Sequence, residues 1–291
     1  MAEAVLSVDA EVAFKMRMDL GEGPLWDASV QALYWTDLVN RKLYKGDPIS
    51  GRSVERDLPY RASRVTPCRN GQMLFSFTRG PAIGSYDGDV FAPLATDFEI
   101  PKEVRVNDGA CDASGRFWTA TYDPTLSAAI GCIYCVENGR VSTKATDITL
   151  ANGIRFSPDN KTMYFVESLP GRLWAYEFDL AEARLGGRTL LVDYEGTGVK
   201  PDGCTIDTDG CVWVAEVNRS RIARYTPAGK LDQAVRVPAL KPTSVCFGGV
   251  ANDVLFITTR CTGDEDNPLA GSVFAARVPA TGLTEHPYGN A

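Results

Sequence analysis

Six polar residues recur along the chain at intervals of 41 to 50 residues. They are Glu22, Ser63, Asn107, Asn152, Asp202 and Thr243. Each lies five residues before a polar turn, so the six occupy equivalent places in a repeat. Two carboxylates and two carboxamides brought together would form a hard-oxygen ligand set of the kind that suits Ca²⁺, Mg²⁺ or Mn²⁺. Such a set leaves coordination positions for water or substrate, as a catalytic metal site does.

A second interpretation of these residues is a hydrogen-bonded polar plug that binds no ion. Two adjacent carboxylates repel one another unless a cation compensates, which favours the metal. Other acids compete for the role of ligand, because Asp37, Glu167 and Glu216 follow aromatic residues in three of the repeats. We expect these three to be hydrogen-bond partners within turns or between repeats, or to hold the metal ligands in position.

Other kinds of catalytic machinery are poorly represented in the sequence. The single histidine, His286, lies near the C-terminus, which disfavours a Ser-His-Asp or Cys-His mechanism and a histidine-based zinc site. No Gly-x-Ser-x-Gly turn is present, and Gly196-Thr-Gly198 lacks the third glycine of a dinucleotide site. Chemistry therefore depends on carboxylates, amides, hydroxyls and an ion held by oxygen.

The elements that must position these residues are short strands. Four segments share a phrase in which a polar turn precedes a strand with an aromatic residue: DASVQALYW from Asp27, DASGRFWTA from Asp112, SPDNKTMYF from Ser157 and DTDGCVWVA from Asp207. Two weaker copies are CRNGQMLFSF from Cys68 and GGVANDVLFIT from Gly248. Each copy continues into a further strand, and Pro and Gly punctuate the connections.

Repeats of this length with three or four strands are typical of propeller blades. We therefore predict an all-β fold, with residues 1–291 forming a single six-bladed β-propeller domain. A strand at about residues 10–18 would pair with the last blade and close the ring. A β-sandwich is the alternative, but it does not explain a sixfold phrase. Because first strands line the channel of a propeller, the six polar positions should converge at one end of it.

The composition supports a globular protein that binds neither nucleic acid nor a membrane. Apolar residues make up 44% and charged residues 23%. The net charge of −7 disfavours nucleic acid and anionic membranes. The first twenty residues lack a long apolar stretch, so we expect no signal peptide, a cytoplasmic location and eight reduced cysteines. A closed propeller of this size is expected to be a monomer.

Four motifs in order carry a family resemblance. They are Gly21-Glu22-Gly23-Pro24, Arg105-Val-Asn107-Asp108-Gly109, Asn152-Gly153 followed by Ser157-Pro158-Asp159, and Pro201-Asp202-Gly203. With them the sequence resembles the senescence-marker-protein/gluconolactonase family, which includes regucalcin and bacterial sugar lactonases. The resemblance covers nearly the whole chain, and the four motifs are specific together although each alone is weak.

The resemblance implies one divalent ion in the channel, with Glu22, Asn152 and Asp202 as its ligands. It implies that Arg105 binds substrate, that Asn107 binds substrate or lies close to the metal, and that the reaction is hydrolysis of an aldonolactone. The chain departs from the animal members after Trp118, where Thr119-Ala-Thr-Tyr122-Asp replaces a Gly-Thr-Met pattern. Tyr122 is therefore a further candidate for contact with the substrate.

The mechanism expected from this set is attack of water on a lactone carbonyl that the cation polarises. Asp202 would act as the base or orient the water, and the sequence leaves both roles open. It also leaves open whether the ion is Ca, Mn, Mg, Zn or Fe. Two alternatives remain: a non-enzymatic, regucalcin-like calcium-binding propeller, and an organophosphate or other ester hydrolase that uses the same ion.

Overall fold

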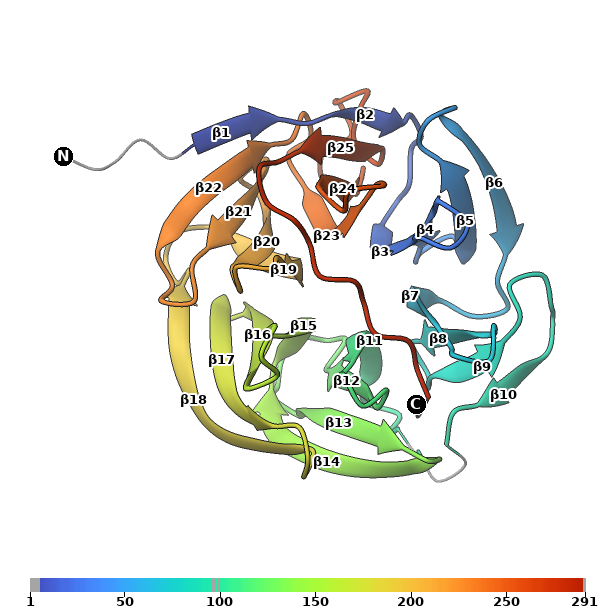
Figure 1. Cartoon of the computed structure of the whole chain (residues 1–291), viewed down its shortest axis with the longest axis vertical. Helices are drawn as coiled ribbons and strands as arrows, with labels where there is room; N and C mark the ends of the chain where they lie inside the picture. The colour runs from blue at the N-terminus through green and yellow to red at the C-terminus, as the bar shows by residue number, and fades with distance from the viewer. Residues whose placement is uncertain (1–5, 96–97, 99, 290–291) are drawn as a thin grey trace.

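Six small antiparallel sheets surround a central axis (Figure 1). The computed structural model describes residues 6–95, 98 and 100–289, in which the regular elements are β1 to β25. The all-β, six-bladed propeller is therefore confirmed, and separate sheets around one axis exclude the two-sheet sandwich.

The blades follow one another in chain order, and each runs from the channel outward. Blade 1 contains β3 (Gly21–Asp27), β4 (Ala32–Asp37), β5 (Lys42–Asp47) and β6 (Arg52–Asp57). Blade 2 contains β7 (Ala62–Pro67), β8 (Met73–Phe77), β9 (Ala82–Gly84) and β10 (Phe91–Pro93). Blade 3 contains β11 (Arg105–Cys111), β12 (Phe117–Tyr122), β13 (Gly131–Glu137) and β14 (Arg140–Ile148).

The remaining three blades continue the ring. Blade 4 contains β15 (Leu150–Phe156), β16 (Thr162–Leu169), β17 (Arg172–Asp179) and β18 (Arg184–Asp193). Blade 5 contains β19 (Lys200–Ile206), β20 (Val212–Val217), β21 (Arg221–Tyr225) and β22 (Leu231–Arg236). Blade 6 contains β23 (Pro242–Gly248), β24 (Val254–Thr259) and β25 (Val273–Arg277).

The N-terminal part of the chain lies along blades 5 and 6 (Figure 1). The first strand, β1 (Leu6–Asp9), pairs in parallel with β22. The second, β2 (Glu11–Phe14), pairs antiparallel with β25 and gives blade 6 its fourth strand. These pairings cover two outer edges with strands from the opposite end of the chain, which joins the beginning of the fold to its end.

A buried aspartate explains the phrase that opens the repeats of blades 3 and 5. In blade 5, Asp207 accepts hydrogen bonds from the backbone N–H groups of Asp209 and Cys211 at 3.0 and 2.9 Å. It also accepts from Nε1 of Trp213 at 2.8 Å and from Nε of Arg224 at 2.7 Å. In blade 3, Asp112 bonds in the same way to its turn and to Trp118 Nε1. In each of these two blades, one carboxylate thus fixes both the turn and the tryptophan of the next strand.

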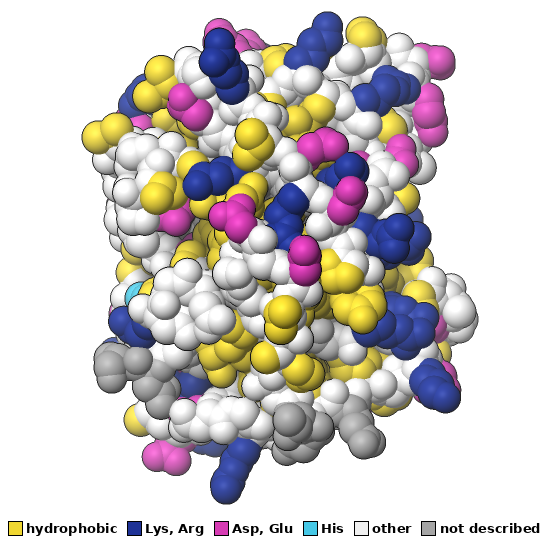
Figure 2. Space-filling view, turned by 90° about the vertical axis from the view of Figure 1, so that its right-hand side faces the viewer, with side chains coloured by type: hydrophobic (Ala, Val, Ile, Leu, Met, Phe, Trp, Pro, Cys, Tyr) yellow, Lys and Arg dark blue, Asp and Glu magenta, His cyan; other side chains and the backbone are white. Residues whose placement is uncertain are grey.

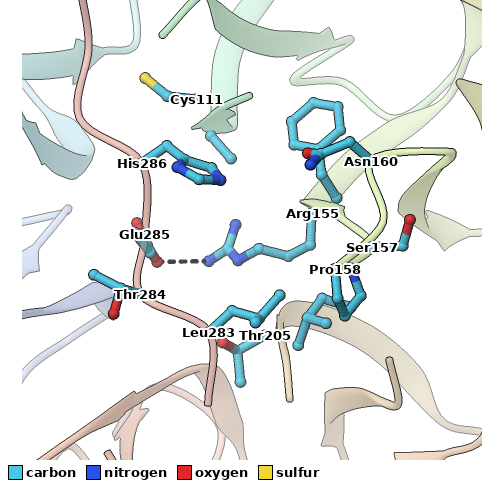
Figure 3. A pocket seen from close by; sticks show the side chains of 13 residues that line it. Cys111, Arg155, Ser157, Pro158, Asn160, Thr205, Leu283, Thr284, Glu285 and His286 are labelled. Carbon is cyan, nitrogen blue, oxygen red and sulfur yellow. Dashed lines mark ion pairs between the residues drawn. The ribbon is translucent and has the colours of Figure 1, made fainter. Parts of the chain in front are cut away.

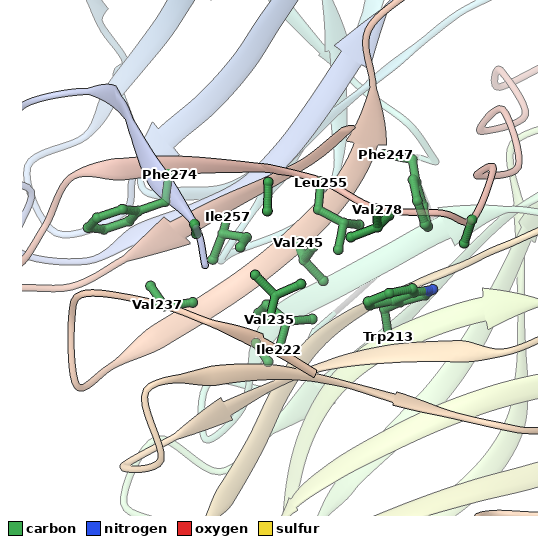
Figure 4. Close-up of a cluster of buried hydrophobic side chains, with 14 of the residues drawn as sticks. Trp213, Ile222, Val235, Val237, Val245, Phe247, Leu255, Ile257, Phe274 and Val278 are labelled. Carbon is green, nitrogen blue, oxygen red and sulfur yellow. The ribbon is translucent and has the colours of Figure 1, made fainter. Parts of the chain in front are cut away.

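The hydrophobic core lies between adjacent blades. Between blades 5 and 6, aliphatic side chains of β21–β25 pack around Trp213, whose ring meets Phe247 edge-on with centroids 5.9 Å apart (Figure 4). Fully burying a side chain of this size contributes about 1.5–3 kcal/mol. Similar clusters hold the other blades together, so the channel walls are supported from outside.

The cysteines form no disulfide. All eight are free thiols, and seven of them are buried, with Cys132 partly exposed. No helix in residues 6–95, 98 and 100–289 has the length and apolar content needed to span a bilayer.

Replacing Asp207 with alanine should destabilise the fold strongly, because it leaves the Trp213 indole and the Arg224 guanidinium without their buried acceptor. We expect Asp207→Ala to lower the free energy of unfolding by about 3–5 kcal/mol, measured by urea denaturation. Asp209→Ala is the matched control, because the Asp209 side chain is 73% exposed and pairs with the same arginine. Asp209→Ala should lower the free energy of unfolding by less than about 1 kcal/mol. Equal losses in the two variants would contradict the structural role of Asp207.

Candidate active site

Every first strand of the propeller is interrupted by a β-bulge at the same place. The pairing register shifts between Glu22 and Leu25, Ala62 and Val65, Val106 and Gly109, Asn152 and Ile154, Pro201 and Cys204, and Pro242 and Ser244. These are the positions of the sixfold polar set. A bulge bends its strand and re-aims a side chain, so the repeated irregularity gives all six residues a local geometry that a regular strand would not.

Glycine follows the polar residue in three of the blades, and the crowding there explains why. A Cβ atom at Gly23 would lie 2.3 Å from the carbonyl oxygen of Ser63, and Gly23 has a φ of 50°. A Cβ atom at Gly203 would lie 2.2 Å from Oγ of Ser244. The first strands therefore approach each other too closely for a side chain at these points.

The two asparagines of the set are in direct contact. Nδ2 of Asn107 donates to Oδ1 of Asn152 at 3.0 Å and to the carbonyl oxygen of Ala151 at 2.6 Å. Nδ2 of Asn152 donates to Oγ of Ser168 at 2.8 Å, and this hydroxyl donates to the carbonyl oxygen of Pro201 at 2.5 Å. A continuous chain of hydrogen bonds therefore links blades 3, 4 and 5 and ends beside Asp202.

The two carboxylates of the set, Glu22 and Asp202, influence one another electrostatically. Burial, the charge of Asp202 and the charge of Asp108 raise the pKa of Glu22 well above its ordinary value. Burial raises the pKa of Asp202 to about 8, although the Arg260 guanidinium opposes the change. Both side chains keep some solvent contact. They are desolvated acids that lack full compensation by positive charge.

Below these carboxylates, two arginines and two acids form a buried ion-pair cluster. Arg64 lies 3.1 Å from Asp108 and 2.5 Å from Glu285. Arg155 lies 3.9 Å from Asp108 and 3.5 Å from Glu285. The cluster neutralises itself, so it offers little positive charge to Glu22 and Asp202.

The candidates for substrate contact lie across a strand pair from each other. Arg105 and Tyr122 are Cα partners in the register of β11 and β12. Burial raises the pKa of Tyr122, and the charges of Arg105, Arg61 and Glu22 all act on it, so these groups share one region. Nη1 of Arg105 already donates to the carbonyl oxygens of Lys102 and Val104, each at 2.8 Å, which leaves its other nitrogens for a ligand.

The donor set fits a divalent cation. Among the described residues, no group of three His, Cys, Asp or Glu side chains gathers as a metal-binding cluster. The predicted set instead combines two carboxylates with the carboxamide oxygen of Asn152. Hard oxygen donors and an uncompensated pair of desolvated acids are the chemistry that Ca²⁺, Mg²⁺ or Mn²⁺ satisfies.

The opposite end of the channel is covered by the C-terminal segment, residues 279–289, which crosses the centre of the ring (Figure 1). The N–H groups of Leu283 and Tyr288 donate to the carbonyl oxygens of Ile206 and Pro67, at the far ends of β19 and β7. Asp202 lies near the start of β19 and Ile206 at its end, so this segment and the carboxylate pair occupy different ends.

A cavity of about 190 Å³ lies beneath the C-terminal segment, and no residue of the sixfold polar set lines it (Figure 3). Arg155 points into it and is paired with Glu285, while His286 borders it from the segment itself. Burial lowers the pKa of His286. The single histidine is therefore remote from the carboxylate pair.

The competing acids have structural partners. Asp37 accepts from the backbone N–H groups of Asp19 and Leu20 and from Nδ2 of Asn40. Glu167 accepts from the N–H of Thr149 and from Trp174 Nε1. Glu216 accepts from Arg221 and from the Tyr225 hydroxyl. All three brace turns and strands, as the sequence predicted.

Sequence reasoning missed several charged residues of the channel. Asp108 and Arg64 stand one position after members of the polar set, where three other blades carry glycine, and that exception was a usable signal. Glu285 lies outside the repeats, and no sequence pattern pointed to it. Arg260 follows the second strand of blade 6 and acts on both Glu22 and Asp202.

Comparisons with known proteins agree over nearly the whole chain. Residues 20–260 match the family model of the SMP-30/Gluconolactonase/LRE-like region. A 6-deoxy-6-sulfogluconolactonase of Pseudomonas putida is 32% identical over 273 residues, which are 91% of this chain and 94% of that protein. A pentonolactonase of Haloferax volcanii is 31% identical over 278 residues, 91% of this chain and 93% of that protein. The crystal structure of a calcium-binding protein, regucalcin, from Agrobacterium tumefaciens superposes with a TM-score of 0.91 at 26% identity, covering 98% of this chain and 99% of that one.

Removing the Ser168 hydroxyl should weaken the hydrogen-bonded chain across blades 3 to 5. Ser168→Ala leaves Nδ2 of Asn152 and the Pro201 carbonyl without their buried partner. We expect the free energy of unfolding to fall by about 1–3 kcal/mol in urea denaturation. Ser142→Ala, at an exposed position on β14, is the control and should change it by less than about 0.5 kcal/mol. An unchanged free energy of unfolding in Ser168→Ala would mean that this series of hydrogen bonds does not stabilise the fold.

Proposed function

This chain belongs to the SMP-30/gluconolactonase/LRE-like family, and we propose that it is a carboxylic-ester hydrolase that opens a sugar lactone to its aldonic acid. The relatives named as a sulfogluconolactonase and a pentonolactonase support lactone hydrolysis as the reaction. Their substrates differ in the sugar, so the family alone does not select one.

One observation carries the proposal. Glu22 and Asp202 are desolvated acids that raise one another's energy, and they lie with Asn107 and Asn152 at equivalent bulges of their first strands. Isolated buried acids are costly, so a fold that retains them needs a compensating partner. A cation with open coordination positions is such a partner, and hydrolysis of a polarised carbonyl is the reaction that it promotes.

Glu22, Asn152 and Asp202 are the residues that would hold the ion. When bound, a divalent cation supplies Lewis-acid polarisation of the lactone carbonyl. Asn107 keeps Asn152 in place, because its amide nitrogen donates to Oδ1 of Asn152. Ser168 fixes the other end of the same carboxamide. These two hydrogen bonds set the direction of the Asn152 oxygen before any ligand arrives.

Asp202 is the proposed proton acceptor or water-orienting group. The N–H of Gly203 hydrogen-bonds to its carboxylate and restrains it. The imidazole of His286 is at the far end of the channel, so a carboxylate is the available base beside the carbonyl. Asp202 would take a proton from the attacking water, or hold that water in line with the carbonyl carbon.

Arg105 and Tyr122 would bind the sugar hydroxyls. The free nitrogens of Arg105 are donors with a fixed geometry, since Nη1 is tied to two backbone carbonyls. The Tyr122 hydroxyl can both donate and accept. The amide nitrogen of Asn107 is already used, so Asn107 offers its carbonyl oxygen to the substrate.

A non-enzymatic calcium-binding propeller is the second candidate. It is favoured by the superposition on the structure described as a calcium-binding protein, regucalcin. That function requires the same three ligands but no water-activating role for Asp202. Metal binding without turnover of any lactone would distinguish it from the hydrolase.

Turnover should depend on the ion. We expect hydrolysis of one or more pentono- or hexonolactones, followed with a pH indicator, to disappear after chelation and return when Ca²⁺, Mn²⁺, Mg²⁺, Zn²⁺ or Fe²⁺ is added. A phosphotriester in the same panel tests the organophosphate alternative. Lactone turnover that survives complete chelation would overturn the metal-dependent mechanism.

Two isosteric variants should test the proposed roles of Asp202 and Glu22. We expect Asp202→Asn to lower kcat by about 100-fold or more, because it removes the proton acceptor. We expect Glu22→Gln to weaken the affinity for the ion at least about tenfold in calorimetric titration. Asp209→Asn, at an exposed turn, should change neither quantity. Parent-like turnover in Asp202→Asn would rule out its catalytic role, and unchanged affinity in Glu22→Gln would move the ion elsewhere.

A further inference from the structure

The C-terminal segment leaves two cavities at the far end of the channel. One, of about 190 Å³, lies between residues 283–286 and the turn at residues 157–160 (Figure 3). The other, of about 150 Å³, shares the wall formed by Leu283, Thr284 and Glu285. One water needs about 10–15 Å³ of such space. The larger cavity therefore has room for a molecule of several non-hydrogen atoms.

The polar group of the larger cavity is a loosely joined pair, Arg155 and Glu285. The Arg155 side chain is 7% exposed and points into the cavity (Figure 3). Its Nη2 lies 3.5 Å from Oε1 of Glu285, and its Nη1 lies 3.9 Å from Oδ2 of Asp108. Both distances are longer than an ordinary N–H···O hydrogen bond. The other oxygen of Glu285 lies 2.5 Å from Nη2 of Arg64, so Glu285 is drawn toward Arg64.

Both members of the pair keep an unsatisfied atom. Nη1 of Arg155 donates to the carbonyl oxygen of Ile154 at 2.6 Å. Within residues 6–95, 98 and 100–289, Nε of Arg155 and Oε1 of Glu285 are buried with no hydrogen-bond partner in the protein. Such a group costs about 1–3 kcal/mol while it stays unpaired. A ligand beside the pair needs an acceptor for the guanidinium and a donor for the carboxylate, and a hydroxyl group supplies both.

The charge around the cavity favours a neutral ligand. Arg64 and Arg155 balance Asp108 and Glu285, so the cluster as a whole attracts neither an anion nor a cation. His286 borders the cavity, and burial lowers its pKa, so the imidazole is uncharged at neutral pH.

The rest of the wall is apolar. Phe156, Ile206 and Leu283 line the cavity, and they offer no hydrogen bond to water. Carbon-bound hydrogens of a ligand would displace poorly bonded water from this wall, which is favourable. At the rim, the side chains of Asn160 and Thr284 can donate and accept. Thr284 is exposed, so a small molecule can enter beside it.

Ion pairs on the outer wall have a different environment. There basic and acidic side chains are interspersed and face solvent (Figure 2). Arg56, for example, lies 3.7 Å from the fully exposed Asp89, where bulk water can complete the hydrogen bonds of both groups. The Arg155–Glu285 pair is enclosed, so only a molecule inside the cavity can complete its bonds.

We propose that this cavity is a second binding site, and that it takes a small neutral polyhydroxyl compound such as a sugar or a sugar alcohol. Hydroxyl groups of the ligand accept from Arg155 and donate to Glu285, while its carbon-bound hydrogens face the apolar wall. The site lies at the opposite end of the channel from the carboxylate pair, so it does not depend on the proposed hydrolysis.

The single histidine of the chain makes a direct test possible. The ring of His286 borders the cavity, so its Cε1 proton gives one NMR signal that reports on this site. We expect titration of the tag-free protein with sorbitol at constant pH to shift this signal saturably, with a Kd of about 1 mM. We also expect a nuclear Overhauser effect between the ring proton and carbon-bound protons of sorbitol.

Three variants locate the bound molecule. Glu285→Gln replaces a charged acceptor with a neutral one and should weaken sorbitol binding about tenfold. Glu137→Gln, an exposed acid at the end of β13, is the matched control and should leave the affinity unchanged. Asp202→Asn should also leave it unchanged, because Asp202 is at the other end of the channel. The Overhauser effect in the parent protein decides the location if Glu285→Gln does not fold.

Four outcomes would overturn the inference. The absence of both a saturable shift and an Overhauser effect would mean that the cavity holds water only. A tighter Kd for inorganic phosphate than for sorbitol would mean an anion site. Loss of the shift in Asp202→Asn would place sorbitol at the carboxylate pair. Equal affinity in Glu285→Gln and the parent would exclude the contact with the Arg155–Glu285 pair.

Discussion

Acidic side chains in the central channel need positive charge beside them, because the packed first strands keep most water away. The protein meets this requirement in two ways. Asp108 and Glu285 are paired with Arg64 and Arg155 inside the channel. Glu22 and Asp202 have only the partial help of Arg260, and their pKa values rise as a result. The fold thus contains both a closed ion-pair cluster and an acidic pair with only partial charge compensation.

The propeller creates this situation by repeating one local irregularity. A register shift recurs at the same point of six first strands, and glycine after three of the polar residues lets the strands approach closely. The rigidity comes from outside the channel, where buried aspartates fix the turns and aromatic residues fill the space between blades. The bulged positions can therefore carry strained or repelling groups without loss of the fold.

The two ends of the channel differ because the C-terminal segment crosses only one of them (Figure 1). The C-terminal segment crosses the far end and contributes Glu285 to the ion-pair cluster. The other end keeps the acidic pair and the Asn107–Asn152 contact. In the proposed function, a ligand beside the acidic pair would meet Arg105 and Tyr122, which are paired across two strands of blade 3.

The sequence by itself determined the number of blades and the equivalence of Glu22, Asn107, Asn152 and Asp202, because a turn and the strand after it are local features that recur at a readable spacing. It also predicted the bracing roles of Asp37, Glu167 and Glu216. Only the tertiary structure decided that Asp108, Arg64, Arg155 and Glu285 neutralise one another. Those relations depend on side chains from different blades and on the path of residues 279–289, and charge pairing across such separations follows from packing in space, which no repeat in the sequence encodes.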